Sequence, residues 1–336
     1  MAELVNSRIL GLGHYLPERV VTNDELTRLM DTTDEWIQQR TGIRERRFTA
    51  PDRGPADLAL HAARDAIAAA GIAASDLDLI ILGTLSPDVD FPASASLLQR
   101  ALGVRGMPAM DVRDQCSGFI YMLAVADKFI RTGGARYVLV VGAEVHSTGI
   151  DLTTQGREVA VIFGDGAGAV VLGPESDHRR GVLSTHLHSE GKYAEKLMVE
   201  VPTSRVRPRI TEEMLSGPGS RLWPRMEGRY VFKHAVTRFP EVINEALDAN
   251  GYTVADLDLL IPHQANLRIS QMVAMGLELP EEKVFNNIQR YGNTTAASIP
   301  IALHEAVLAG RVRPGALVCL AAFGAGFTWG AALMRW

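Results

Sequence analysis

One helix–strand pattern occurs twice in the sequence, about half a chain apart. Residues 66–83 read AIAAAGIAASDLDLIILG, and residues 246–263, which lie 180 positions further on, read ALDANGYTVADLDLLIPH. In both segments a helix-like stretch ends at a glycine, Gly71 or Gly251, and an Asp-Leu-Asp-Leu run then opens an apolar stretch typical of a buried strand. The pattern predicts a duplicated scaffold, and coincidence between two common helix–strand units is the alternative.

Helix-like and strand-like segments also alternate between the two copies. Apolar residues at helical spacing predict helices over 56–70 and 118–130, and short apolar runs predict strands at 8–12, 79–82, 137–141 and 169–172. Buried strands that alternate with helices predict a layered α/β fold. A charged stretch that starts with proline, residues 174–181, separates the halves, so we expect units of 1–173 and 181–336.

The composition is that of an ordinary globular protein. The 336 residues are 47% apolar and 22% charged, and 34 basic against 39 acidic side chains give a net charge of −5. This balance argues against wholesale disorder and against a nucleic-acid partner. Two cysteines cannot form a disulfide framework, and the first six residues, MAELVN, lack the basic start and apolar core of a signal peptide. We therefore expect a cytoplasmic protein.

Only residues 315–334 are long enough without a charge to raise the question of a membrane span, at twenty residues. Gly324, Gly326 and Gly330 interrupt this stretch. It therefore reads better as two short apolar strands, near 317–322 and 330–334, joined by a glycine turn. We expect no membrane insertion.

The two cysteines lie in different contexts. Cys116 opens the predicted helix over 118–130, in the run DQCSGF, where unpaired N–H groups and the helix dipole favour a thiolate and can hold an anionic intermediate. A small buried hydrophobic side chain is the competing interpretation of Cys116. Cys319 lies inside an apolar strand, LVCL, and is expected to be structural.

His263 and Asn293 are the polar residues that the repeat singles out. His263 follows the second copy of the repeated strand, where an imidazole can reach a crevice and act as a donor or a base. Asn293 lies 177 positions after Cys116, close to the repeat offset, and so precedes the equivalent helix over 299–308. A helix N-cap is the alternative role of Asn293, and a solvated imidazole is the alternative for His263.

Motifs for common cofactors are missing or incomplete. The run GDGAG at 164–168 is followed by a strand and not by a helix, so it does not predict dinucleotide binding. A phosphate-binding Walker loop, an HExxH helix and paired CxxC motifs do not occur. His186 and His188 share one face of a strand but have no evident third ligand, so we expect no metal site.

Taken together, the segments resemble a 3-oxoacyl-[acyl-carrier-protein] synthase III, a condensing enzyme of the thiolase superfamily. The resemblance covers nearly the whole chain and rests on the joint order of GHYLP (13–17), DEWI (34–37), RTGIR (40–44), DQCSGF (114–119), FGDGAG (163–168), HQANLR (263–268), GNT (292–294) and FGAGFTWG (323–330). It implies a thiolase-like duplicated fold of five layers, α-β-α-β-α, which agrees with the repeat.

The resemblance also implies a catalytic triad of Cys116, His263 and Asn293. Cys116 would take the acyl group from an acyl-CoA, and malonyl-acyl carrier protein would then lose carbon dioxide. His263 and Asn293 would donate hydrogen bonds to the enolate that forms, and the product would be a 3-oxoacyl-carrier protein. The backbone N–H groups of Cys116 and Ala325 would form the oxyanion hole. No metal and no cofactor beyond the CoA thioester substrate are implied.

Further positions follow from the same resemblance. Residues placed along the CoA and its pantetheine arm are Trp36, Arg40, Arg157, Phe232 and Asn266. Lys233 and Arg268 would offer positive charge to the acidic carrier protein, and a solvated surface lysine is the alternative for Lys233. Phe91 would reach across a homodimer to close the partner's acyl pocket.

Two departures from the family pattern bear on the substrate. Residues 190–226 form a longer segment than in compact members, and Arg229 stands where many relatives have asparagine. The first leaves the starter acyl length open. The alternatives are therefore a specialised starter enzyme or acyltransferase of a secondary pathway that uses a medium or longer acyl-CoA, and a non-catalytic subunit that binds the carrier protein.

Overall fold

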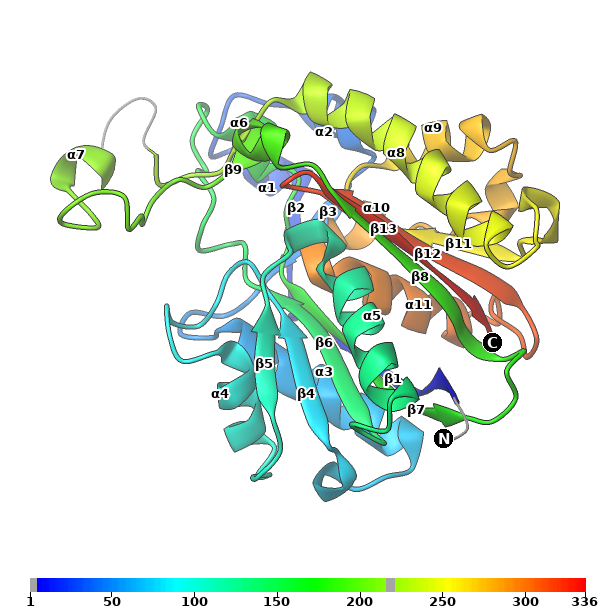
Figure 1. Cartoon of the computed structure of the whole chain (residues 1–336). Helices are drawn as coiled ribbons and strands as arrows, with labels where there is room; N and C mark the ends of the chain where they lie inside the picture. Colours follow the sequence, from blue (N-terminus) through cyan, green and yellow to red (C-terminus); the bar gives the residue numbers. More distant parts are fainter. Residues whose placement is uncertain (1–4, 216–220) are drawn as a thin grey trace.

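The computed structural model describes residues 5–215 and 221–336. Most of the segment on which the signal-peptide prediction rests, residues 1–4, lies outside the described residues, as does Pro218 of the long segment. Within the described part the chain forms two mixed β-sheets with helices between and outside them (Figure 1).

The first sheet has five strands in the order β1-β7-β6-β4-β5. β4 runs parallel to β5 and β6, whereas β7 runs antiparallel to β6 and β1. The strands are β1 (Asn6–Tyr15), β4 (Leu79–Gly83), β5 (Ala109–Val112), β6 (Val138–Glu144) and β7 (Gly166–Glu175). β1 and β5 are the edge strands, and the outer side of β5 has no strand neighbour in the described chain.

The second sheet has four strands in the order β11-β12-β13-β8 and repeats this topology. β11 and β12 are parallel, and β13 runs antiparallel to β12 and β8, as β7 does to β6 and β1. The strands are β8 (Gly181–Ser189), β11 (Leu259–Pro262), β12 (Leu317–Gly324) and β13 (Thr328–Arg335). At the place of β5, only an isolated parallel bridge joins Val284 to Leu260.

The helices complete five layers. α5 (Gly118–Arg131) and α11 (Ser298–Leu308) lie between the sheets, with α3 (Pro55–Ala70) and α4 (Ser94–Ala101) outside the first and α8 (Gly228–Asp248) and α9 (Leu267–Gly276) outside the second (Figure 1). Buried side chains of α5 and α11 pack with both sheets in one central core. Each outer helix pair forms a separate core with its own sheet. The predicted five-layer arrangement is confirmed, and the division at 173 and 181 stays a prediction.

The aspartates of the repeated Asp-Leu-Asp-Leu run have the same role in both copies. Asp76 accepts a hydrogen bond from the N–H of Ala73 at 2.8 Å, and Asp256 accepts one from Thr253 at 2.8 Å, so each closes a single 3-10 turn. The second aspartates, Asp78 and Asp258, each accept from a backbone N–H at the start of the neighbouring strand, Tyr137 at 2.9 Å and Leu317 at 2.7 Å. Both copies of the repeat therefore use their two aspartates in the same way, as acceptors for backbone N–H groups.

Smaller elements connect these layers. They are β2 (Arg19–Thr22), β3 (Glu45–Phe48), α1 (Asn23–Leu26), α2 (Asp34–Thr41), α6 (Arg157–Ala160), α10 (Ile288–Tyr291) and short 3-10 turns at Ala74–Asp76, Gln115–Ser117, Gly191–Lys196, Val254–Asp256, Glu281–Lys283 and Thr295–Ala297. Together with the loops between them, several of these elements border the site described below.

The charge-free stretch near the C-terminus forms the antiparallel pair β12 and β13. The strands are longer than predicted, and the connection between them is Ala325-Gly326-Phe327. Both strands are buried between layers, which explains the absence of charge. Among the described residues, no helix is long and apolar enough to cross a membrane.

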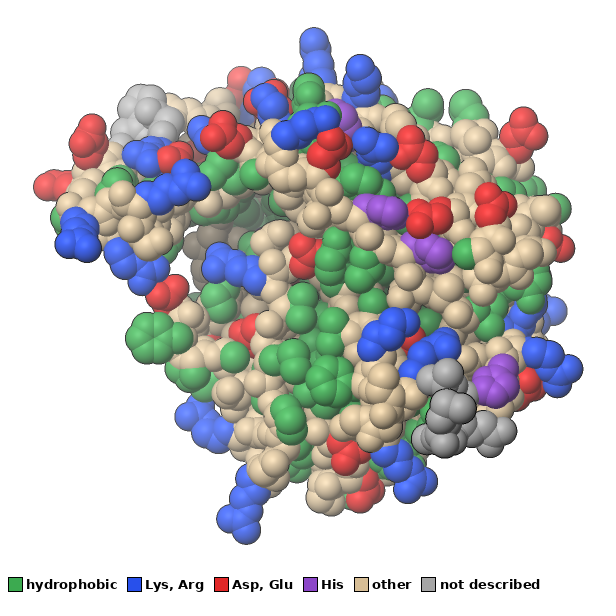
Figure 2. Space-filling model, viewed as in Figure 1, with side chains coloured by type: hydrophobic (Ala, Val, Ile, Leu, Met, Phe, Trp, Pro, Cys, Tyr) green, Lys and Arg blue, Asp and Glu red, His purple; other side chains and the backbone are tan. Residues whose placement is uncertain are grey.

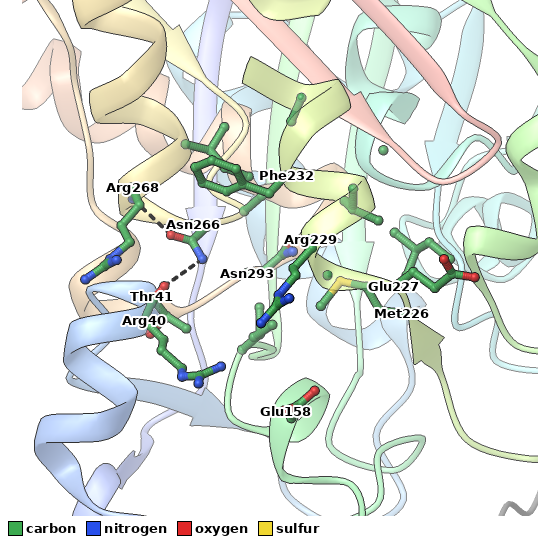
Figure 3. Close-up of a pocket in the computed structure, with 18 of the residues that line it drawn as sticks. Arg40, Thr41, Glu158, Met226, Glu227, Arg229, Phe232, Asn266, Arg268 and Asn293 are labelled. Atoms are coloured by element: carbon green, nitrogen blue, oxygen red, sulfur yellow. Dashed lines mark hydrogen bonds between the residues drawn. The ribbon is translucent and has the colours of Figure 1, made fainter. Parts of the chain in front are cut away.

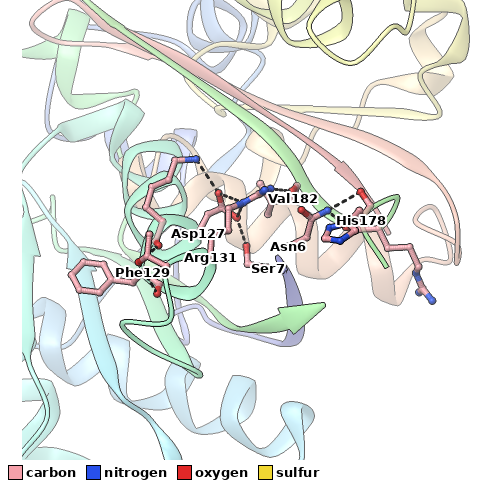
Figure 4. Close-up of polar contacts among 10 residues, drawn as sticks. Asn6, Ser7, Asp127, Phe129, Arg131, His178 and Val182 are labelled. Carbon is pink, nitrogen blue, oxygen red and sulfur yellow. Dashed lines mark hydrogen bonds and ion pairs between the residues drawn. The ribbon is translucent and has the colours of Figure 1, made fainter. Parts of the chain in front are cut away.

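Buried polar contacts tie β1, α5 and β8 together where the two halves meet (Figure 4). The Asp127 carboxylate accepts hydrogen bonds from the Ser7 hydroxyl at 2.7 Å and from Arg131 Nε at 2.8 Å. Arg131 in turn donates to the Val182 carbonyl at 2.6 Å, and Asn6 donates to the carbonyl of His178 at 2.9 Å. The chain between the halves is thus attached to both.

The long segment after β8 projects from the body of the molecule. It contains β9 (Leu197–Met198), α7 (Glu212–Leu215) and β10 (Arg225–Met226), and β9 pairs with β10 at its base. α7 extends beyond the sheets in Figure 1, and Figure 2 shows the surface hollowed between this projection and the rest of the molecule.

Candidate active site

A cavity of about 1100 Å³ connects the surface to the start of α5. Cys116, Asn293, Phe323 and Gly324 line it and are buried, whereas Arg40, Arg229 and Arg268 line it and are exposed. The cavity therefore has an apolar inner end that contains a thiol and an outer end that carries positive charge. Figure 3 shows the arginines around the opening.

Cys116 lies in the 3-10 turn Gln115–Ser117 that leads into α5, as the sequence predicted. Gly324, the last residue of β12, packs directly against it. A Cβ added at Gly324 would lie 2.4 Å from Cβ and 2.9 Å from Sγ of Cys116. Only glycine lets this strand end approach the thiol so closely.

The expectation that Cys116 favours the thiolate is opposed by its burial. Desolvation, with the nearby carboxylate of Glu144, raises the pKa of the Cys116 thiol to about 12. Hydrogen bonds from the backbone N–H groups of Ala325 and of Cys116 itself act in the opposite direction on this pKa. The thiol is thus protonated at neutral pH, and a nucleophilic attack by Cys116 has to be coupled to loss of its proton.

Cys319 lies in the middle of β12 and is fully buried, which confirms its predicted location. Burial raises the pKa of the Cys319 thiol to about 12, and no backbone hydrogen bond opposes this shift. The two thiols therefore differ in their surroundings. Only Cys116 opens onto the cavity.

His263 directly follows β11 and is buried. Its Nδ1 lies 2.7 Å from the Ser298 hydroxyl oxygen, which also accepts a hydrogen bond from the Gln264 N–H at 3.3 Å. Burial lowers the pKa of His263 to about 3, so the imidazole is neutral. Nε2 is buried and has no hydrogen-bond partner among the described residues. His263 itself is not among the residues that line the cavity.

Asn293 follows α10 and is held by two backbone hydrogen bonds. Its N–H donates to Ile162 O at 2.8 Å, and its carbonyl accepts from the Gly164 N–H at 3.1 Å. The side-chain oxygen Oδ1 accepts from the Thr295 N–H at 2.8 Å. Since Oδ1 is engaged, the Nδ2 donor is the group that Asn293 can offer to the cavity that it lines.

The residues predicted to contact CoA lie on several elements around the opening. Trp36 on α2 lines the cavity, and the Arg40 guanidinium lies 4.5 Å from the centre of its ring. Arg157 lies 5.4 Å from the same ring and forms an ion pair with Asp31 at 3.5 Å, but does not itself line the cavity. The indole and its two cations form a surface suited to a flat ring with phosphate groups.

The side chain of Asn266 is already engaged within the protein. Its Nδ2 donates to the Arg40 carbonyl at 2.9 Å, and its Oδ1 accepts from the Arg268 N–H at 2.9 Å (Figure 3). Asn266 is therefore the N-cap of α9 and attaches this helix to the end of α2, while it also lines the cavity. Its side chain thus holds α2 and α9 together beside the opening of the cavity.

Phe232 lines the cavity from α8, whereas Lys233 is exposed on the same helix and does not line it. Arg229, one of the departures from the family pattern, lines the opening with Arg268 (Figure 3). Phe91 is 82% exposed and does not line the cavity of its own chain. The structure thus brings most predicted residues to one cavity. The predicted residues outside its lining are Arg157, Lys233, Phe91, His263 and Ala325.

Sequence reasoning missed several buried polar residues near the site. Glu144 ends β6 and accepts hydrogen bonds from the hydroxyls of Thr84 at 3.1 Å and Ser86 at 2.8 Å. Burial raises the pKa of Glu144 to about 7 and that of Asp114 to about 7. Ser298 was also missed as the partner of His263. Ser298 and His263 are 35 positions apart in the sequence, and no local pattern marks a contact over this separation.

His186 and His188 both bind Glu245, at 3.1 Å from Nδ1 and 2.6 Å from Nε2. In the part of the chain that the structure describes, no group of three or more His, Cys, Asp or Glu side chains is placed to hold a metal ion. The histidine pair is thus part of the contact between β8 and α8.

Comparison with known proteins gives the family. A model described as 3-oxoacyl-[acyl-carrier-protein (ACP)] synthase III matches residues 110–191, and its C-terminal counterpart matches residues 247–336. A beta-ketoacyl-[acyl-carrier-protein] synthase III of Xanthomonas euvesicatoria is 51% identical over 336 residues, which cover all of both chains. The chain belongs to the 3-oxoacyl-[acyl-carrier-protein] synthase III family.

Solved structures of this family agree with the fold. The 3-oxoacyl-[acyl-carrier-protein] synthase III of Aquifex aeolicus is 44% identical and superposes with a TM-score of 0.90 over 98% of this chain and 100% of that chain. The priming beta-ketosynthase of the R1128 polyketide biosynthetic pathway is 34% identical, with a TM-score of 0.89 over 100% of this chain and 98% of that chain. The predicted family and thiolase-like fold are thus confirmed.

Proposed function

We propose that the protein condenses an acyl-CoA with malonyl-acyl carrier protein, with loss of carbon dioxide, and so starts fatty-acid chains. The observation that carries this proposal is the cavity that leads from a cationic opening to Cys116 and Asn293, in a chain with a full-length family match. The opening suits a CoA phosphate end and an acidic carrier protein. Lys233 and Arg268 are the proposed carrier-protein contacts.

In the first half-reaction, the Cys116 sulfur attacks the thioester carbonyl, the bond to the CoA sulfur breaks, and the proton of the thiol leaves with CoA. The tetrahedral oxyanion accepts hydrogen bonds from the backbone N–H groups of Cys116 and Ala325. The backbone hydrogen bonds that both residues direct at the thiol support this assignment. Loss of one such donor typically costs about 10²–10³ in rate.

In the second half-reaction, the malonyl C–C bond to the carboxylate breaks and carbon dioxide leaves. Negative charge develops on the thioester oxygen, which accepts hydrogen bonds from His263 Nε2–H and Asn293 Nδ2–H. The carbanion then attacks the acyl group on Cys116, and the Cys116 thiolate leaves and takes up a proton from water, which restores the thiol. A neutral His263 fits this role, because the Nε2–H of a neutral imidazole donates a hydrogen bond to the enolate oxygen without giving up its proton.

The homodimer and the cytoplasmic location are part of the same proposal. The unpaired outer side of β5 and the exposed ring of Phe91 support a partner copy that meets this face and receives Phe91 in its acyl pocket. Light scattering coupled to size exclusion measures the mass of the assembly. Two free, buried cysteines are consistent with a reducing compartment.

The alternative is a starter enzyme for medium or longer acyl groups. Leu197, Met226 and Glu227, at the base of the long segment, line the cavity, so this segment can influence which acyl chain enters. The full-length match to a beta-ketoacyl-[acyl-carrier-protein] synthase III favours the first proposal.

The decisive experiment is intact-protein mass spectrometry after mixing with acetyl-, butyryl-, octanoyl- or dodecanoyl-CoA. We expect an acyl adduct that is lost in Cys116→Ala and kept in Cys319→Ala, the matched control. Adducts from acetyl-CoA support a fatty-acid initiator, and adducts from octanoyl-CoA or longer alone support the alternative. No adduct from any thioester overturns the covalent mechanism and favours a non-catalytic subunit.

A further inference from the structure

His146 is a buried histidine near the site that the mechanism above does not use. It lies two residues after β6, and its side chain is 5% exposed. Its Nε2 lies 2.6 Å from the Thr295 hydroxyl oxygen, and its ring packs against Phe163 with 4.5 Å between the ring centres. A buried imidazole in so short a contact is held in one orientation.

The backbone of His146 is itself fixed by Asp165, from the FGDGAG run that the sequence analysis left without a role. Asp165 Oδ1 accepts hydrogen bonds from the N–H groups of His146 at 2.7 Å and Ser147 at 2.9 Å. Its Oδ2 accepts from the Ser147 hydroxyl at 2.6 Å and from the Thr49 N–H at 2.8 Å. The carboxylate is therefore fully engaged in holding the segment that carries His146.

Thr295 connects His146 to the site. Its φ is +50°, a left-handed conformation that is unfavourable for a β-branched residue and persists only where its surroundings hold it. This backbone directs the Thr295 N–H to Asn293 Oδ1 at 2.8 Å. The hydroxyl of the same residue is the group that His146 contacts. Fixing the Thr295 side chain thus fixes the N–H that orients the Asn293 amide.

The charge of His146 fits this arrangement. Burial, with the nearby His263, lowers the pKa of His146 to about 3, so it is neutral at working pH. A neutral imidazole can hold the hydroxyl without placing a positive charge beside His263. The segment Ile162–Asp165 acts on Asn293 twice, through backbone hydrogen bonds and through His146.

We propose that His146 is a positioning residue for the condensation reaction, which acts through Thr295 to aim the Asn293 amide at the enolate oxygen, with Asp165 as its anchor. This inference rests on the role proposed for Asn293. It concerns the decarboxylating half-reaction alone, because Cys116 takes up the acyl group without Asn293.

The two partial reactions separate positioning from a general structural role. Decarboxylation of malonyl-carrier protein is measured as release of labelled carbon dioxide, and acylation of Cys116 is followed by mass spectrometry with the acyl-CoA that labels it. Thr295→Val removes the hydroxyl at nearly constant shape, and Thr295→Ser keeps it. His146→Phe removes the contact, and His146→Gln keeps a polar group near the position of Nε2.

We expect Thr295→Val and His146→Phe to slow decarboxylation about 10- to 100-fold and to leave the acylation rate within about twofold. Thr295→Ser and His146→Gln should recover most of the decarboxylation rate. In an Asn293→Ala background, Thr295→Val should have no further effect, because the amide that it misplaces is gone. Thermal unfolding of each variant shows which of them are folded.

Equal losses in both half-reactions, or additive losses in the double variant, would show that His146 and Thr295 only support the fold and would overturn the proposal. Normal decarboxylation by Thr295→Val beside a slow Asn293→Ala would overturn the positioning role and leave the proposed function intact. Normal decarboxylation by Asn293→Ala would overturn the role of Asn293 and, with it, this inference.

Discussion

The Ser298 hydroxyl oxygen lies 2.7 Å from Nδ1 of His263, so the two atoms share a hydrogen bond on the side of the imidazole opposite Nε2. The Ser298 oxygen accepts a hydrogen bond from the Gln264 N–H, and the hydroxyl proton of Ser298 can reach Nδ1 of His263. When Ser298 donates to Nδ1, Nε2 is the protonated nitrogen, and the donor role proposed for His263 requires this direction. A donor, and not a base, is what the enolate oxygen requires.

Replacing Ser298 with alanine should release His263 from this tautomer. We expect Ser298→Ala to slow decarboxylation of malonyl-carrier protein about tenfold and to change Cys116 acylation little, since acylation does not need the Nε2 donor. Ser7→Ala is the matched control, because it also removes a buried hydroxyl, one that binds Asp127 at 2.7 Å far from the site. A control variant that slowed decarboxylation equally would contradict the tautomer assignment.

The contact between Gly324 and Cys116 leads to a second prediction. A Cβ at Gly324 would lie 2.4 Å from the Cys116 Cβ, and both residues are buried, so the thiol has to move. We expect Gly324→Ala to slow acylation of Cys116 about 100-fold or more, because a displacement near 1 Å has effects of this size.

Gly191→Ala is the control for this substitution, since a Cβ there would meet nothing within 4 Å. Acylation rates come from the time course of adduct formation by mass spectrometry. Acylation of Gly324→Ala at the wild-type rate would mean that the end of β12 shifts to accommodate the added Cβ. The close approach of Gly324 to the thiol would then not be required.

Much of the fold was predictable because it depends on local and repeated signals. Gly71 and Gly251 have φ of +68° and +71°, the left-handed conformation that ends a helix, and each precedes the aspartate caps of the repeated run. Gly324 and Gly326 likewise mark the turn between β12 and β13, whereas Gly330 lies inside β13. Such features can be read from the sequence because glycine is the residue type that most readily adopts the backbone conformation a helix end or a tight turn needs.

The inner parts of the site were harder to predict because they depend on contacts across the chain. The pKa of Cys116 is set by burial and by Glu144, which no local pattern reveals, so the helix N-terminus alone gave the wrong direction. His146 and Thr295 are 149 residues apart in sequence, and only the packing of the two halves brings them together. Asn266 was expected to contact CoA, yet its amide is used to join α9 to α2.

Histidine burial predicts loss of stability in acid. The pKa of His146 is lowered from 6.5 to about 3, so between these values the unfolded chain binds a proton that the folded chain does not. The contribution of His146 to stability therefore falls as the pH drops below 6.5. At pH 5 the contribution of this one group is about 2 kcal/mol.

Between pH 7 and pH 5, the free energy of unfolding of His146→Gln should accordingly fall by about 2 kcal/mol less than that of the wild type, because glutamine does not titrate. Urea unfolding at the two pH values gives the comparison. His263 is shifted in the same direction and remains in the variant, so part of the acid sensitivity should persist. An identical pH dependence in both proteins would contradict the lowered pKa of His146.

The last prediction concerns the junction between the halves, where the Asp127 carboxylate is 1% exposed. Asp127→Ala would leave the Arg131 guanidinium and the Ser7 hydroxyl without their acceptor, and Arg131 also holds the Val182 carbonyl of β8. Loss of one partner from a buried pair typically costs about 3–5 kcal/mol, and we expect Asp127→Ala to lower the free energy of unfolding by about 3 kcal/mol because Arg131 is partly exposed.

Lys128→Ala is the control. Lys128 also contacts Asp127, but its side chain is 65% exposed, so the free energy of unfolding should change by less than about 1 kcal/mol. Chemical denaturation measures both, and equal shifts for the two variants would show that burial of the carboxylate does not set the strength of this contact.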